Sequence, residues 1–373
     1  MELTLQPRRI REARMFRGFT QSDLAQAVGI TKQAVSQCET GVLTPSAETL
    51  VRISNALEFP LSFFSHPFAS PILAPVFFRK RKTAAKKTRY VFETYIEWMS
   101  DIYEYIERHV HLPEVCLVTD ERVGYTPTEL SRIATKLRRH WGLGDGPISD
   151  MTLLLENNGI IISKVGLDAS KVDACSVFYT PVSSRKRPMI FLTSGTSSVR
   201  SRRDLAHELG HQVLHSWMDK EEFEAYQDVI EQDADIFASF FLMPEQSMRR
   251  ESFAVKTLDS LLLMKQRWGA SAQSILYHLL QIGCIDQKLG ESLRQGLYRR
   301  GWRTYEPGED VIPHEHPGLI HDALMLLIDN NVKTRLELLD DLALPATDVC
   351  ELCGFPKNFF TPKDTRPALS LVK

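Results

Sequence analysis

The sequence predicts a multi-domain protein with an all-α helix-turn-helix domain at the N-terminus, an α+β core with a small sheet, and a C-terminal helical region. Three observations predict this architecture. Short capped helices follow one another over residues 8–64, β-branched segments follow residue 151, and two amphipathic helical segments come next. A chain of 373 residues has room for two or three domains, and 43% hydrophobic and 25% charged residues are typical of globular proteins.

Capping residues predict the N-terminal helices. Thr20, with Asp23 three residues later, begins one helix, and Gly29 ends it. Thr31 begins the next helix, so the pair has helix-turn-helix spacing. Polar side chains on the outer face of the second helix suit a DNA major groove, in which Gln pairs with adenine and Lys with guanine: Lys32, Gln33, Ser36 and Gln37. Gln21, at the start of the first helix, is placed to hold a phosphate.

This stretch resembles the lambda-repressor-like (Xre) helix-turn-helix family. The matching patterns are T-x-x-x-L-A-x-x-x-G from Thr20, S-x-x-E-x-G from Ser36 and P-x-x-x-T-L from Pro45. The resemblance implies a domain over residues 1–66 that binds double-stranded operator DNA. In it Lys32, Gln33 and Gln37 would read bases, and Gln21 and Ser36 would make backbone or auxiliary contacts. A small helical bundle that binds protein is the alternative.

The charge distribution favours a DNA-binding unit at the N-terminal end only. Residues 1–90 hold 14 basic and 6 acidic residues, a net +8, which leaves −10 for the remainder. Residues 67–89 are predicted to be a linker with three prolines and a basic run at 79–89. That run either grips the DNA backbone or is solvated. Residues 90–150 are expected to form a helical connector.

Residues 151–300 contain the predicted α+β core. Residues 159–163, 174–180 and 189–192 are predicted strands, and residues 193–203 a polar loop. His207-Glu208-Leu209-Gly210-His211 follows on a helix, where positions i and i+4 share one face, so both imidazoles can bind one zinc ion (Zn2+). Glu208 lies between them and can take a proton from the attacking water.

The third metal ligand is sought in a following helix. Its apolar face is spaced as one helical stripe: Phe223, Tyr226, Ile230, Ala234, Phe237 and Phe241. Glu231 is the preferred ligand because its side chain is long enough to reach from a packed helix, and Asp233 is the competing choice. Asp235 would hold a ligand imidazole through its other N–H. His215 is expected to cap the first helix or support a ligand.

The core resembles the ImmA/IrrE metallopeptidase family. The matching stretches are D-L-A-H-E-L-G-H-x-x-L-H from Asp204 and E-x-D-A-D-x-F-A-x-x-F-L-M-P from Glu231. The second acidic position is Asp233, where the family commonly has Glu. The resemblance implies a zincin-like zinc endopeptidase whose substrate is typically a repressor-type protein with a similar helix-turn-helix. A transcription factor whose zinc domain is a proteolytically idle sensor is the alternative.

Residues 301–373 are predicted to form an acidic helical region that echoes the N-terminal domain. Residues 353–360 match residues 57–64, and residues 334–353 have helix-turn-helix spacing. This second copy carries acidic side chains where the first has Lys and Gln, so it should not bind DNA: Glu337, Asp340, Asp341, Asp348 and Glu351. A homodimer contact or a partner-docking role is the hypothesis.

Composition excludes several classes of protein. No apolar run approaches 18 residues and the N-terminus has no signal-like segment, so we expect a cytoplasmic protein without membrane contact. The six cysteines form no disulfide-like pattern, which agrees with a reducing compartment. Cys350 and Cys353 form a single C-x-x-C, which we interpret as a pair of packing residues.

Overall fold

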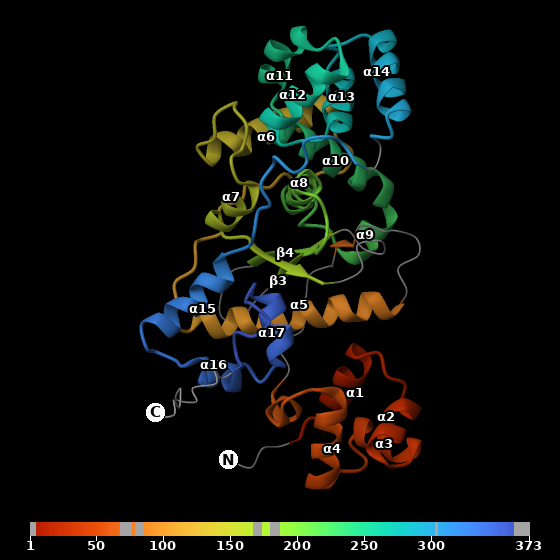
Figure 1. The fold of residues 1–373 in the computed structure, drawn as a ribbon, viewed down its shortest axis with the longest axis vertical. Helices are drawn as coiled ribbons and strands as arrows, with labels where there is room; N and C mark the ends of the chain where they lie inside the picture. The colour runs from red at the N-terminus through yellow and green to blue at the C-terminus, as the bar shows by residue number, and fades with distance from the viewer. Residues whose placement is uncertain are drawn as a thin grey trace, which may run out of the picture. The chain divides into compact units, whose positions relative to one another are not determined.

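The computed structural model describes residues 5–67, 77–78, 86–166, 174–179, 187–302 and 305–361. The chain divides into two compact units (Figure 1). The first is drawn from residues 1–69, 89–110 and 321–373, and the second from residues 70–88 and 111–320. Each unit is described by itself.

The first unit begins with the predicted helix-turn-helix. Its elements are α1 (Pro7–Phe16), α2 (Gln21–Val28), α3 (Lys32–Thr40), α4 (Ala47–Leu57) and the 3-10 helix η1 (Leu61–Ser65). Thr20 and Asp23 form a capping box on α2, and Gly29 ends that helix with a left-handed backbone. Thr31 caps α3. The predicted capping and turn are therefore confirmed.

The long helix α5 (Lys86–Glu107) shares a core with α1. Trp98 on α5 is fully buried, and its ring lies 4.4 Å from that of Phe16. Its Nε1 donates a hydrogen bond of 2.8 Å to Oε1 of Glu12. A buried indole with its N–H bonded contributes both apolar contact and orientation, so this side chain ties α5 to α1.

Three C-terminal helices complete the first unit: α15 (Leu319–Asp329), α16 (Arg335–Leu342) and α17 (Ala346–Leu352). Nη2 of Arg17 lies 2.8 Å from Oδ2 of Asp348, and the hydroxyl of Tyr105 donates to Oδ2 of Asp341 at 2.9 Å. Asp348 is only 5% exposed. Asp348 therefore does not belong to the acidic surface predicted for this region, because its carboxylate is buried against an arginine of the N-terminal domain.

The echo between the two ends of the chain is also a local structural repeat. A capping box at Thr334 begins α16, as one at Thr20 begins α2. The backbone N–H groups of Phe59 and Phe355 each donate to the carbonyl five residues earlier, those of Ser54 and Cys350. Each turn leads into a cluster of three phenylalanine rings: 59, 63 and 64 in the first copy, and 355, 359 and 360 in the second.

The second unit contains a four-stranded sheet in the order β1-β3-β4-β2, of which Figure 1 labels β3 and β4. The strands are β1 (Phe77–Phe78), β2 (Ile161–Val165), β3 (Ala174–Tyr179) and β4 (Arg187–Thr193). β2 runs parallel to β4, while β3 is antiparallel to both β4 and β1. Every residue of β4 is buried, as expected of a strand paired on both sides and covered by helices.

Helices pack around this sheet, and α8 lies between the sheet and α10. The helices of the unit are α6 (Pro127–His140), α7 (Met151–Asn157), α8 (Ser198–Leu214), α9 (Lys220–Ala225), α10 (Gln227–Leu242), α11 (Glu245–Glu251), α12 (Leu258–Trp268), α13 (Ala272–Gln281) and α14 (Gln287–Arg299), with the 3-10 helix η2 (Ser252–Ala254) after α11. The α+β core predicted for this region is therefore confirmed.

Two predicted boundaries in this unit are wrong. The stripe from Phe223 to Phe241 belongs to two helices, because the chain breaks at Tyr226, which is 47% exposed between α9 and α10. The polar segment 193–203 is not all loop, since α8 already begins at Ser198. Periodicity locates an apolar face more reliably than the residue at which a helix begins or ends.

Some predictions fall where nothing is described. Most of the linker at 67–89 and its basic run, including residues 79–85, lies outside the described residues, as does residue 180 of one predicted strand. Cys350 and Cys353 are buried, in agreement with packing roles. Among the described helices, none has the length and apolar character needed to cross a membrane.

Candidate metal centre

The candidate metal centre depends on a close approach of α8 and α10 at a glycine. A Cβ atom added to Gly210 would lie 3.1 Å from Cα of Ala234 and 3.3 Å from its carbonyl oxygen. Such contacts are tighter than ordinary van der Waals distances, so a larger residue here would require the two helices to shift apart by a few tenths of an ångström. Glu231 is one turn before Ala234 on α10, and His211 follows Gly210 directly on α8.

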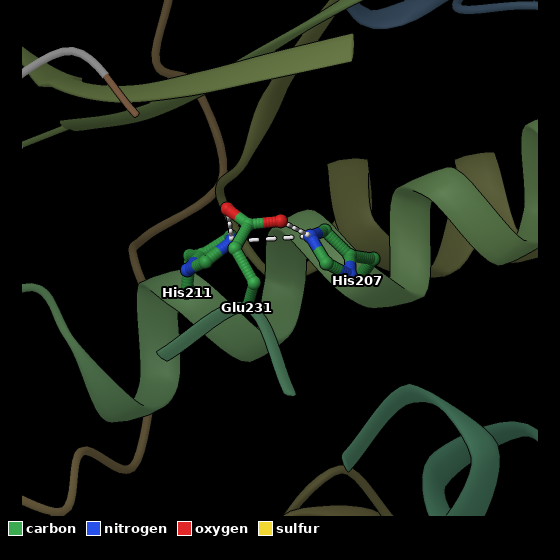
Figure 2. Close-up of side chains that lie close together, drawn as sticks. All are labelled: His207, His211 and Glu231. Carbon is green, nitrogen blue, oxygen red and sulfur yellow. Dashed lines mark hydrogen bonds and ion pairs between the residues drawn. The ribbon is translucent and has the colours of Figure 1, made fainter. Parts of the chain in front are cut away.

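Three side chains from these helices converge on one point (Figure 2). Nε2 of His207 lies 3.1 Å from Nε2 of His211. One carboxylate oxygen of Glu231 lies 3.5 Å from Nε2 of His207, and the other lies 3.5 Å from Nε2 of His211. Ligands about 2.0–2.2 Å from a tetrahedral zinc ion lie roughly 3.3–3.5 Å from one another, so the set has the spacing of a zinc site.

The chemistry of these donors fits a divalent cation. Both histidines are buried, and Oε1 of Glu231 is buried and makes no hydrogen bond within the described part of the chain. Burial lowers the pKa of His207. Hydrogen bonds to Asp235 and Glu231 and the charge of Glu208 together outweigh burial, so the pKa is raised to about 9. Burial raises the pKa of Glu231, but contacts with the two imidazoles outweigh it and hold the pKa well below its usual range. This concentration of negative charge favours a cation at the common point.

Asp235 orients the first histidine. Its Oδ1 lies 2.7 Å from Nδ1 of His207 and accepts a 2.8 Å hydrogen bond from Nη2 of Arg203. A carboxylate at Nδ1 keeps the proton on that nitrogen and leaves the Nε2 lone pair directed at the metal position. This contact agrees with the role proposed for Asp235 from the sequence, which is to hold a ligand imidazole through its other N–H.

His215 lies against the second histidine. It is the C-cap residue of α8, is fully buried, and its Nδ1 lies 3.0 Å from Nδ1 of His211. Burial, followed by the charges of His211 and His207, lowers the pKa of His215 well below its usual range. His215 is therefore neutral and can accept one hydrogen bond at Nδ1.

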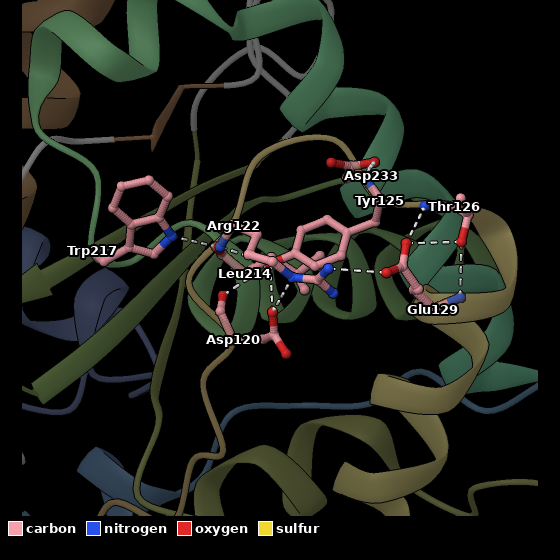
Figure 3. A network of polar contacts seen from close by, with 8 residues as sticks. All are labelled: Asp120, Arg122, Tyr125, Thr126, Glu129, Leu214, Trp217 and Asp233. Carbon is pink, nitrogen blue, oxygen red and sulfur yellow. Dashed lines mark hydrogen bonds and ion pairs between the residues drawn. The ribbon is translucent and has the colours of Figure 1, made fainter.

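Of the two acids left open as third ligand, only Glu231 lies against the histidines. Asp233 is 3% exposed, and its Oδ1 accepts a long hydrogen bond of 3.4 Å from the backbone N–H of Tyr125 (Figure 3). Burial raises its pKa, against hydrogen bonds from the backbone of Tyr125 and Gly124. Its shorter side chain therefore anchors the loop before α6, and the hydroxyl of Tyr125 holds the same loop through Asp120.

The predicted base Glu208 lies on α8, whereas His278 and Tyr277, a further histidine and tyrosine of this unit, lie on α13. Glu208 is 1% exposed on α8, directly after the first histidine. His278 is buried in the core, where its Nε2 donates to the carbonyl of Met243 at 2.9 Å, and Tyr277 is 58% exposed. The structure thus gives His278 a packing role rather than a place at the metal position.

Two residues of the site were missed by the sequence analysis. Arg203 binds Asp235, and Gly210 permits the approach of α10. Arg203 falls in the segment predicted to be a loop, although it is four residues before His207 and therefore shares its face of the helix. A helix begun at Ser198 would have identified it. The importance of Gly210 needed the partner helix to be known.

Gln21 is the first residue of α2, and the other proposed DNA-reading residues lie on α3 from its first residue to its middle. Lys32 and Gln33 are exposed, while Ser36 and Gln37 are half-buried. Nε2 of Gln21 donates to Oε2 of Glu39 at 2.9 Å, and the Glu39 carboxylate also pairs with Arg14. This network links the start of α2 to α3, so the Gln21 side chain proposed to contact phosphate is already hydrogen-bonded within the domain.

Two family models match segments of the chain. No curated protein matches the sequence. The helix-turn-helix family model matches residues 10–64, and the model of the IrrE N-terminal-like domain matches residues 159–280. The chain therefore joins an Xre-like helix-turn-helix, the domain of DNA-binding regulators, to a metallopeptidase-like domain of the IrrE and ImmA type.

Proposed function

We propose that the protein is a DNA-bound regulator whose second unit is a zinc-dependent endopeptidase acting on a repressor-type protein. The observation that carries the zinc site is the mutual spacing of His207, His211 and Glu231, at 3.1, 3.5 and 3.5 Å. Zinc, when bound, would supply a Lewis acid that polarises the scissile carbonyl. The repressor-type substrate is proposed from the family resemblance.

Metal binding, ligand orientation and proton transfer are assigned to different residues of the chain. His207, His211 and Glu231 would hold the metal, and Asp235 would keep the lone pair of His207 directed at it. Glu208 would remove a proton from the attacking water and return it to the leaving amine. Burial of Glu208 and both histidines excludes bulk water, which strengthens these electrostatic interactions.

The same burial also favours the alternative of an idle zinc sensor. His207 is 0% exposed and Glu208 and His211 are each 1% exposed, whereas the Glu231 side chain is 24% exposed. A peptide must therefore approach from the Glu231 side. A sensor needs only the bound metal, whereas a peptidase also needs a path by which a peptide reaches the metal. Cleavage of a protein substrate therefore distinguishes the two functions.

Glu208→Gln tests the peptidase. The change keeps side-chain volume but removes the base, so cleavage of a helix-turn-helix repressor by zinc-loaded protein should fall by at least about 100-fold. Zinc content should stay near that of the wild type. Mass spectrometry of the products and elemental analysis give the two readouts.

The matched control is Glu291→Gln on the exposed face of α14, which should cleave normally. A Glu208→Gln variant that still cuts would remove this assignment. Wild-type protein that binds zinc but cuts none of the repressors encoded beside it would favour the sensor.

Gln37→Ala tests the DNA-reading helix. Loss of a bidentate contact to a base should weaken operator binding by about 1–3 kcal/mol and relax the preference at one base pair. Asn55→Ala on α4, exposed but outside the predicted reading face, is the control. Equal effects of both substitutions in a binding titration at fixed salt would argue against the proposed face.

A further inference from the structure

We propose that His215 is a positioning residue that fixes the tautomer of the metal ligand His211, and that Gln212 completes this hydrogen-bonded relay. The inference rests on the proposed zinc site. It assigns to the second histidine a support different from the carboxylate that supports the first.

The relay follows from the placement of two ring nitrogens. Nδ1 of His211 and Nδ1 of His215 lie 3.0 Å apart, and the two residues are 1% and 0% exposed. At that distance one nitrogen carries a proton and the other accepts it, because two N–H groups or two lone pairs would repel each other. Nε2 of His211 faces the metal position, 3.1 Å from Nε2 of His207.

The proposed metal position determines which of the two Nδ1 atoms carries the shared proton. A histidine that binds a cation through Nε2 offers its lone pair there and keeps its proton on Nδ1. His211 is therefore the donor and Nδ1 of His215 the acceptor. His215 must then carry its own proton on Nε2, so its tautomer is fixed as well.

Gln212 offers an acceptor for that second proton. Nε2 of His215 is buried without a hydrogen-bond partner in the described part of the chain, and so are both amide atoms of Gln212. Gln212 lies in the last turn of α8, three residues before the C-cap residue His215, so the two side chains leave neighbouring positions at the end of the helix. No direct hydrogen bond joins the two groups in the described part of the chain, so we assign the link between them to one enclosed water, which can bond to both.

The two ligands thus have unequal support. His207 is held by the carboxylate of Asp235, which is in turn held by Arg203, whereas His211 is held by a neutral imidazole. A carboxylate raises the basicity of its histidine more than a neutral acceptor does. The relay therefore orients His211 without adding charge to the buried end of the site.

The test compares two substitutions at His215. Leucine removes the acceptor, so His215→Leu should weaken zinc binding about 10–100-fold, as loss of a partner to a metal ligand commonly does. In His215→Asn the amide oxygen can accept the His211 proton, so zinc affinity should return to within about threefold of wild type if the relay acts through that one bond. Competition with a chelator gives the zinc affinity of each variant.

The control is His278→Leu, which removes another fully buried histidine of the same unit, bonded to the carbonyl of Met243. It should lower the melting temperature of the metal-free protein without changing zinc affinity. Unchanged zinc binding in His215→Leu, or equal losses in His215→Leu and His215→Asn, would overturn the relay while leaving the zinc site in place. Failure of the wild type to bind zinc would overturn the relay together with the proposed peptidase.

Discussion

At the scale of single residues, the proposed metal centre depends on side chains that lie about one helical turn apart. Arg203 and His207 are four residues apart on α8, and both contact Asp235 from α10. Arg203 pairs with the carboxylate that bonds to Nδ1 of His207, so Arg203 and Asp235 act in series behind one proposed ligand. The charge of Asp235 then matters more than its size.

Asp235→Asn should therefore weaken zinc binding by about 10–100-fold. An amide can still accept from Nδ1, but it lacks the negative charge that strengthens the histidine as a ligand. Calorimetric titration with zinc checks the result. Asp228→Asn, exposed on the same helix, is the matched control, and a similar loss in that variant would show a general effect of charge on α10 instead.

At the scale of elements, the centre depends on how closely two helices approach. A Cβ at Gly210 would meet backbone atoms of Ala234, and backbone cannot rotate away as a side chain can. The break at Tyr226 belongs to the same arrangement, because it lets α10 begin in a new direction after α9. Glu231 then reaches the histidines from the second turn of α10.

Gly210→Ala should push the two helices apart. Overpacking of this kind costs about 1–3 kcal/mol of stability, and we expect zinc affinity to fall at least tenfold because Glu231 moves with α10. Chemical unfolding and zinc titration give the two quantities. In Gly296→Ala, on α14, the new Cβ meets only the flexible side chain of Leu258, so neither quantity should fall comparably.

At the scale of the whole molecule, the first unit is assembled from distant parts of the chain. Arg17 near the N-terminus pairs with Asp348 near the C-terminus, and α5 buries Trp98 against α1. The acidic C-terminal copy therefore stabilises the DNA-binding domain from within the chain. Loss of self-association on deleting residues 317–373 remains the test of the separate dimer hypothesis.

The α1–α5 contact should make the first unit sensitive to pH. Burial, opposed by Arg9 and reinforced by Glu12, raises the pKa of Asp101 to about 7, and burial together with Glu12 raises that of Glu97 to about 7. The folded state thus binds protons that the unfolded chain releases near pH 4. This stabilisation is complete below the unfolded pKa and is lost as pH rises through about 7.

Thermal unfolding should accordingly show a lower melting temperature at pH 8 than at pH 5.5, by about 2–4 °C for each kcal/mol lost. Asp101→Asn should reduce the difference, since an amide does not titrate. Asp329→Asn, exposed on α15, should leave it unchanged. Identical pH profiles for wild type and Asp101→Asn would contradict the assignment.

The sequence alone determined the features that depend on spacing within one helix or one turn. Capping at Thr20 and Thr31 located the turn between α2 and α3, and the four-residue interval from His207 to His211 placed two imidazoles on one face, because helix geometry is the same wherever a helix forms. The echo of residues 57–64 at residues 353–360 was likewise readable, since both copies use the same backbone turn.

Only the tertiary structure decided which side chains from different elements meet. Glu231 and Asp233 are equally acidic and two residues apart, but they point to opposite neighbours, one toward the histidines and the other toward the loop at Tyr125. The internal pairing of Asp348 with Arg17 was equally invisible, because the two residues are 331 positions apart. Periodicity states which face of a helix is buried, whereas the identity of the partner depends on close packing between segments that the sequence keeps far apart.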